Sequence, residues 1–191
     1  MQTLSLNQRS KRSAQVPRAR TMAHPGSFNP VRMQSCSAQT GRHLRLLLQP
    51  GRNLFDAIID SLQAHGIRNA SMTLLGGFFD KLQYCTAPPD PSHKTLIAYT
   101  APICTEHSTL VFGNATVGQN EKGKPLVHCH AVVSTAAGTL AGGHIITQQT
   151  VIGPQPISVL ALALEGFKLQ ATYDAETHMS LLQPTPGESH A

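Results

Sequence analysis

The sequence contains no tryptophan and has few other aromatic residues and few charges. Aromatic residues make up 5% and charged residues 13% of its 191 positions, and the charged share is about half of the usual ~25%. With 40% hydrophobic residues, the chain does not have the composition of a disordered solvating segment. No apolar run approaches the ~18 residues of a transmembrane helix, so we expect no contact with a membrane.

The four cysteines show no CxxC spacing; they are Cys36, Cys85, Cys104 and Cys129. In a chain of this size, scattered cysteines do not make the disulfide framework of a small secreted domain. The first residues also lack the apolar stretch of a secretory signal peptide. We therefore expect a cytoplasmic protein with reduced cysteines.

Acidic residues are missing from the first 55 positions, where nine Lys and Arg residues precede Asp56. The rest of the chain carries six basic and ten acidic side chains, so the net charge of +5 comes from the N-terminal third alone. The body is mildly acidic and has few aromatic residues to stack on bases, so it lacks the electrostatic footprint of a nucleic-acid-binding domain. DNA contact is therefore predicted only through the basic N-terminal segment.

The chain divides into a tail at 1–40, a domain at 41–183 and a short tail at 184–191. The first segment mixes polar residues with three prolines and shows no sustained periodicity. Three interpretations of this segment stay open. The first is a disordered or mis-assigned start with initiation at Met22 or Met33, the second is a transit peptide, and the third is a basic tail that touches nucleic acid.

One principal helix is predicted at roughly 53–65. Asn53 suits an N-cap, and Gly66 stands where a C-terminal glycine belongs. Between them, apolar residues recur at helical spacing: Leu54, Phe55, Ile58, Ile59 and Leu62.

The rest of the domain consists of short apolar runs separated by turns rich in Pro, Gly, Asn and Asp. Among others, these runs predict strands at 96–99, 108–116, 126–134 and 139–141. We expect an α+β domain with a mainly antiparallel sheet of about seven or eight strands and one principal helix.

Histidine is abundant, with ten residues, and two of them flank Cys129 in an apolar run. On a strand, His128 and His130 share one face while Cys129 points to the other, where we expect it in the core. A divalent metal that accepts a neutral nitrogen from each imidazole removes the penalty of burying either one protonated and unpaired.

A third ligand is expected from the next segment. His144 follows two consecutive glycines, and a hairpin between the two strands would return it to the side of His128 and His130. Three protein ligands would leave one coordination position for water or substrate. In the alternative interpretation, these are polar residues of a half-buried sheet face, hydrogen-bonded to their neighbours.

Other candidates are weaker. The remaining histidines are expected at the surface, with His107 beside Glu106 as a reserve ligand. No serine has the context of a nucleophile elbow, and no Gly-rich segment leads from a strand into a helix. The sequence therefore assigns no catalytic residue; Glu106 and Glu121 are the nearest acids to a metal site by sequence.

The string GKPLVHCH at 123–130, followed by GTLAGGH at 138–144, resembles the signature of the PPC (plants and prokaryotes conserved) domain family. The similarity continues in Pro50-Gly51, in AHGI at the end of the predicted helix and in YDAET at 173–177, and it spans roughly 41–183. The pairing of HxH with GGH is its most specific part.

This resemblance implies a compact α+β domain that assembles as a homotrimer. It also implies a metal at His128, His130 and His144, because some prokaryotic members hold one at the matching histidines. The fold class is shared with acetolactate decarboxylase, a zinc enzyme that also uses an HxH pair and a later histidine. Plant members are nuclear regulators of transcription that contact DNA through a separate AT-hook, and the family often carries a DNA-binding label.

The sequence departs from the family pattern in two places. It has no Arg-Gly-Arg-Pro core of an AT-hook; SKRS at 10–13 and PRAR at 17–20 are its nearest counterparts. Many prokaryotic members carry a Glu before the strand that is predicted to begin here at Ile157, whereas this chain has Pro156.

We therefore expect a homotrimeric domain that binds a divalent metal, zinc first among them, and has a binding or regulatory role. The alternative is a metal-dependent lyase or hydrolase acting on a small carbonyl or carboxylate substrate. An acid beside the metal would favour the enzyme, and the sequence alone places none there.

Overall fold

The computed structural model describes residues 22–31 and 34–186. This part of the chain contains a ten-stranded sheet, the helix α1 (Leu54–Gln63) and the 3₁₀ turn η1 (Thr147–Gln149). The strands are β1 (His43–Leu48), β2 (Ala70–Gly76), β3 (Phe78–Cys85), β4 (Ile103–Gln119), β5 (Pro125–Ser134), β6 (Leu140–Ile145), β7 (Val151–Ile152), β8 (Ile157–Ala163), β9 (Phe167–Asp174) and β10 (Met179–Pro186). Their pairing is antiparallel except for one parallel contact between β4 and β9. The predicted α+β class is confirmed.

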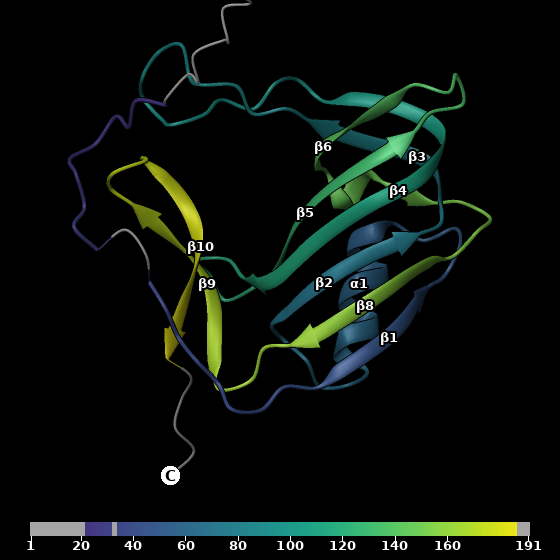
Figure 1. Ribbon diagram of the computed structural model, residues 1–191, viewed down its shortest axis with the longest axis horizontal. Helices are drawn as coiled ribbons and strands as arrows, with labels where there is room; N and C mark the ends of the chain where they lie inside the picture. Colours follow the sequence, from purple (N-terminus) through teal and green to yellow (C-terminus); the bar gives the residue numbers. More distant parts are fainter. Residues whose placement is uncertain (1–21, 32–33, 187–191) are drawn as a thin grey trace, which may run out of the picture.

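The long strand β4 joins two parts of the sheet (Figure 1). Its first half pairs with β3 and its second half with β5 and β2. Because β5 pairs with β6 and β6 with β3, the strands β3, β4, β5 and β6 form a closed circuit, from which β2, β8 and β1 extend. The register of β4 against β5 shifts between Leu110 and Phe112, and such a bulge bends a strand.

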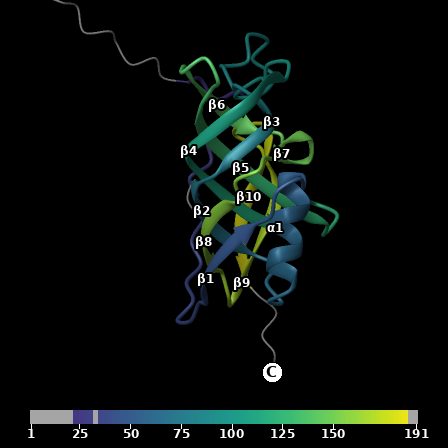
Figure 2. The ribbon, with the colours of Figure 1, turned by 90° about the vertical axis from the view of Figure 1, so that its right-hand side faces the viewer.

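Helix α1 lies against the extended part of the sheet and covers one face of it (Figure 2). It begins where the sequence predicts, because the Asn53 side chain accepts a hydrogen bond from the Asp56 backbone nitrogen at 2.8 Å. Leu54, Ile58 and Leu62 are fully buried against the sheet. The opposite face of the sheet carries no helix in the described part of the chain.

Three strand predictions differ from the structure. The predicted strand at 96–99 belongs instead to a loop at 86–102, where Asp90 accepts hydrogen bonds from Ser92 and Thr95 and the only strand-like contact is a bridge from Pro89 to Ile97. β4 begins earlier than predicted, and β6 continues through the two glycines to Ile145. For β6 the reason is that glycine carries no side chain to show the alternation of a strand, so the sequence pattern predicted an end that is too early.

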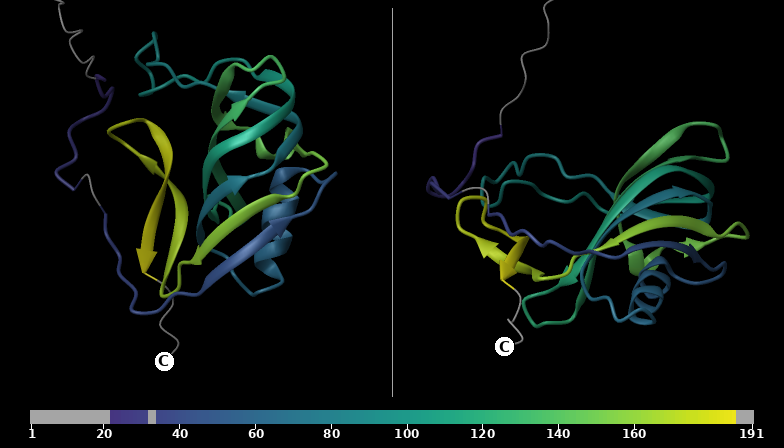
Figure 3. Two further views of the ribbon diagram at one scale, coloured as in Figure 1. Left: turned by 45° about the vertical axis from the view of Figure 1, so that its right-hand side comes forward. Right: turned by 60° about the horizontal axis from the view of Figure 1, so that its bottom comes forward.

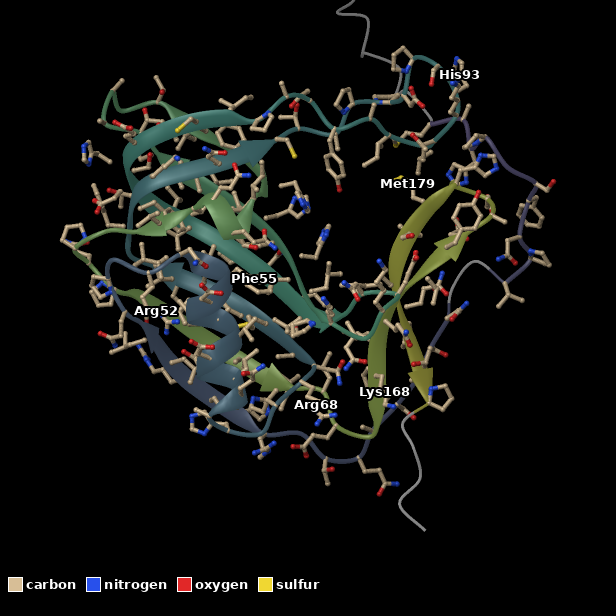
Figure 4. All side chains as sticks on the ribbon, turned by 180° about the vertical axis from the view of Figure 1, so that it is seen from behind. Arg52, Phe55, Arg68, His93, Lys168 and Met179 are labelled. Atoms are coloured by element: carbon tan, nitrogen blue, oxygen red, sulfur yellow. The ribbon has the colours of Figure 1, made fainter. Side chains whose placement is uncertain are left out.

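Strands β9 and β10 form a hairpin that stands apart from the rest of the sheet (Figures 1 and 3). The loop at 86–102 reaches across to the turn of this hairpin, where the Leu96 backbone nitrogen donates to the Thr177 carbonyl at 2.9 Å. Figure 4 shows this arrangement from behind, with His93 in the loop and Met179 at the start of β10 on the same side of the molecule. β10 continues to Pro186, past the predicted domain end at 183.

None of the helices in the described part combines the length and apolar character that a membrane span needs.

A segment of the predicted N-terminal tail is bound to the hairpin. The imidazole Nδ1 of His24 lies 2.7 Å from one carboxylate oxygen of Glu176, and the Asn29 backbone nitrogen donates to the other oxygen at 2.8 Å. Gly26 donates to the Glu176 carbonyl, and its ideal Cβ would lie only 1.8 Å from the Ala175 carbonyl oxygen. Because Glu176 is only 4% exposed, these contacts contribute to the stability of the hairpin.

We expect His24→Ala to lower the free energy of unfolding by about 1–3 kcal/mol, because it removes a partner of a buried carboxylate. For a chain of this size the melting temperature should fall by roughly 2–4 °C per kcal/mol. Thermal denaturation followed by circular dichroism measures the change. His65→Ala, at an exposed histidine, is the control, and equal melting temperatures for the two variants would contradict the prediction.

Candidate metal centre

Strand β5 presents two histidines on the face of the sheet that points away from the core. Its alternate residues Val127, Cys129, Ala131 and Val133 are all buried, so the side chains between them must point to the other face. Cys129 is fully buried, as predicted, and burial raises the pKa of its thiol to about 12. On the other face, the Nε2 atoms of His128 and His130 lie 3.1 Å apart.

Strand β6 brings His144 to the same place. It pairs with β5 so that His144 lies directly opposite His130, and paired residues share a face of the sheet. The two preceding glycines make this pairing possible, with φ of 145° at Gly142 and 154° at Gly143. A Cβ at Gly142 would lie 2.0 Å from the Ala131 carbonyl oxygen, so β6 can approach β5 this closely only with glycine there.

The three histidines form one compact cluster. One nitrogen from each of His128, His130 and His144 lies within 4.8 Å of the other two. The ring centroid of His128 lies 4.9 Å from the centroid of His130 and 4.9 Å from that of His144. The centroids of His130 and His144 lie 5.3 Å apart. Three converging imidazole nitrogens can hold one divalent ion and leave a coordination position open.

The surroundings of His128 and His144 favour their neutral forms. Burial, followed by the charges of the neighbouring rings, lowers the pKa of His144 to about 4. The pKa of His128 is also lowered, first by burial and then by His130. Neutral imidazoles offer the lone pairs that a metal needs. The Nδ1 atom of His144 is buried and has no hydrogen-bond partner among the described residues, which fits a site completed by an ion.

Two further residues at the cluster were not predicted from the sequence. The ring of Tyr99, from the loop at 86–102, lies 4.9 Å from the ring of His144 between centroids. Cys85 in β3 pairs in register with His144 and donates from Sγ to its carbonyl oxygen at 3.7 Å. Burial raises the pKa of both the Tyr99 hydroxyl and the Cys85 thiol, and for Tyr99 the thiol adds to the effect. No sequence pattern marks either residue, because only the register of β3 with β6 and the path of the loop place them here.

The other candidates lie elsewhere. The reserve ligand His107 stacks on Phe78 at the start of β3, at 6.4 Å between ring centroids, and its Nδ1 is 3.9 Å from a carboxylate oxygen of Asp80. Glu106 lies opposite Lys81 in the register of β4 against β3. Glu121 accepts a hydrogen bond from the Ser180 hydroxyl on β10 at 2.5 Å. Within residues 22–31 and 34–186, no carboxylate belongs to the histidine cluster.

A shallow groove of about 480 Å³ begins at His130 and is lined by residues of β4, β5 and β6. Its walls are mainly apolar and include Phe112, Val132 and Leu140. Asn114, which pairs in register with His130, adds a polar amide near the cluster. The groove therefore places apolar surface next to the side chains that could hold a metal.

The fold is similar to that of several solved structures. A metal-containing protein from Archaeoglobus fulgidus has 20% sequence identity and a TM-score of 0.65 over 78% of this chain and 99% of its own. A plant- and prokaryote-conserved (PPC) protein from Pyrococcus horikoshii has 17% identity and a TM-score of 0.59 over 80% and 100%. A protein from Ralstonia eutropha JMP134, described as a presumed DNA-binding protein, has 20% identity and a TM-score of 0.59 over 72% and 88%. At these identities the likeness establishes the fold.

The family assignment comes from the sequence. No curated protein matches the chain. Residues 36–162 match the Plants and Prokaryotes Conserved (PCC) domain. This is the family that the HxH and GGH motifs of the sequence resemble. This match spans more than half of the chain and includes all three clustered histidines. The protein belongs to the Plants and Prokaryotes Conserved domain family.

Proposed function

We propose that the chain is a metal-binding domain in which His128, His130 and His144 together hold one divalent ion. The observation that carries this proposal is the convergence of three nitrogens within 4.8 Å on one face of the sheet. The lowered pKa values of His128 and His144 support it, because both rings are then neutral ligands at pH 7. The Archaeoglobus fulgidus relative is itself described as a metal-containing protein.

Zinc is the metal that this donor set suits best. Three imidazoles with an open position form a common tetrahedral zinc site, and zinc binds nitrogen ligands without demanding a carboxylate. Magnesium and calcium require oxygen ligands, and none of the described carboxylates belongs to the cluster.

Self-assembly is the second part of the proposal. The uncovered face of the sheet carries large apolar side chains that are between 43% and 72% exposed: Leu47, Phe112, Val132, Leu140 and Leu160. An apolar patch of this kind marks an interaction surface. We assign it to further copies of the same chain, and the family resemblance implies three.

We further propose a binding or regulatory role in the cytoplasm. The four cysteines are all free, as expected in a reducing compartment. A role on DNA would depend on the basic residues at 1–21, which lie outside the described residues. The described body supplies no acid at the cluster that could act as a general base in an enzyme.

The groove beside His130 favours an enzyme as the second candidate function. A metal held at the cluster could polarise the oxygen of a small carbonyl or carboxylate substrate, and the apolar walls could receive its carbon chain. In this alternative the protein is a lyase or hydrolase, and Phe112, Val132 and Leu140 contact the substrate instead of another copy of the chain.

Native mass spectrometry tests both metal and assembly in one measurement. The chain is stripped with EDTA, dialysed and reloaded with a small excess of Zn²⁺. We expect three chains per particle and one zinc ion per chain. A particle that retains no zinc after reloading would contradict the metal site, and a monomer would contradict the assembly.

A further inference from the structure

We propose that Tyr99 completes the site by donating a hydrogen bond to a small oxygen anion, a carboxylate or hydroxamate, bound at the open position of the metal. This inference rests on the metal site proposed above. It adds the class of ligand and the residue that recognises it.

The loop at 86–102 is well placed to hold Tyr99 in position. Next to Tyr99, Thr100 and Thr86 close the base of the loop, with backbone and side-chain hydrogen bonds of 3.0 and 3.1 Å between them. On the other side of Tyr99, the Ala98 backbone nitrogen donates to the Pro88 carbonyl at 2.9 Å. The far end of the loop is bound to the hairpin, where His178 Nδ1 lies 2.9 Å from the Lys94 carbonyl oxygen.

The side chain of Tyr99 remains available for a ligand. Its ring lies against His144, yet the residue is 49% exposed. Among the residues that the structure describes, none forms a hydrogen bond with its hydroxyl. A phenol at neutral pH is a hydrogen-bond donor, so Tyr99 offers an unused donor at the edge of the cluster.

The surroundings suit an anion. An ion held by three neutral imidazoles keeps its full positive charge, and no carboxylate in the described part of the cluster competes for it. On the opposite side of the cluster, Asn114 and Thr116 pair in register with His130 and His128 and add short polar side chains. A small oxygen ligand would therefore bind the metal directly and accept a charge-assisted hydrogen bond from the phenol.

Tyr99→Phe tests the inference because it removes the hydroxyl and keeps the ring against His144. The cluster is loaded with Co²⁺, whose visible absorption reports the ligands of the ion, and acetohydroxamate is titrated as the probe. We expect Tyr99→Phe to bind Co²⁺ within about twofold of the wild type and to bind acetohydroxamate about tenfold more weakly. Tyr173→Phe is the matched control, because Tyr173 is exposed on β9 and stacks on His178.

The outcomes separate the inference from the metal site. Equal acetohydroxamate affinity in Tyr99→Phe and wild type, with Co²⁺ bound to both, would overturn the role of Tyr99 and leave the metal site intact. A Tyr99→Phe variant that loses Co²⁺ itself would also overturn it, because the phenol would then be a metal ligand. A wild type that binds no Co²⁺ would overturn the metal site and the inference together.

Discussion

The double variant His128→Ala/His144→Ala should retain less than about a tenth of the metal bound by the wild type. It leaves His130 as the sole imidazole of the cluster, and one exposed histidine does not hold a divalent ion against dialysis. The fold should persist, because the buried face of β5 is unchanged and both substitutions are on the opposite face. Elemental analysis of the purified, zinc-reloaded protein measures the loss.

His43→Ala/His65→Ala is the matched control, since it removes two exposed histidines outside the cluster. The control should keep one ion per chain. Circular dichroism spectra should show that both double variants remain folded. Stoichiometric zinc in His128→Ala/His144→Ala would show that the three histidines are polar residues of the sheet face rather than ligands.

Gly142→Ala should destabilise the domain by at least about 3 kcal/mol. Two effects combine here. The φ of 145° disfavours any side chain, and the new Cβ would lie 2.0 Å from the Ala131 carbonyl oxygen. The clash involves backbone, so β6 must move away from β5, and metal affinity should fall with it. Urea denaturation measures the stability, and a zinc titration with a competing chelator measures the affinity.

Gly138→Ala separates the two effects. Gly138 also has a positive φ, 74°, but nothing lies within 4 Å of its ideal Cβ. Its substitution should therefore cost only about 1–2 kcal/mol, the penalty of the left-handed conformation. It should leave zinc affinity unchanged. Similar losses of stability in the two variants would contradict the role given to the close approach of β5 and β6.

Local patterns determined several features without the structure. The two-residue period of β5 placed Cys129 in the core and His128 with His130 on the opposite face, because side chains on a strand must alternate. The helix was recognisable from Asn53 and the apolar residues after it, because its cap and its packing face are both local. These features depend only on neighbours within a few residues.

The tertiary structure alone decided the rest of the site. The sequence led us to expect His144 beside the pair, but only the register of β6 against β5 places it directly opposite His130. Tyr99 is positioned by hydrogen bonds at the base of a loop that the sequence suggested was a strand. Glu121, a candidate acid by sequence, is bound to β10 instead. Strand register and loop path depend on hydrogen bonds between residues far apart in the chain, and no local period carries that information.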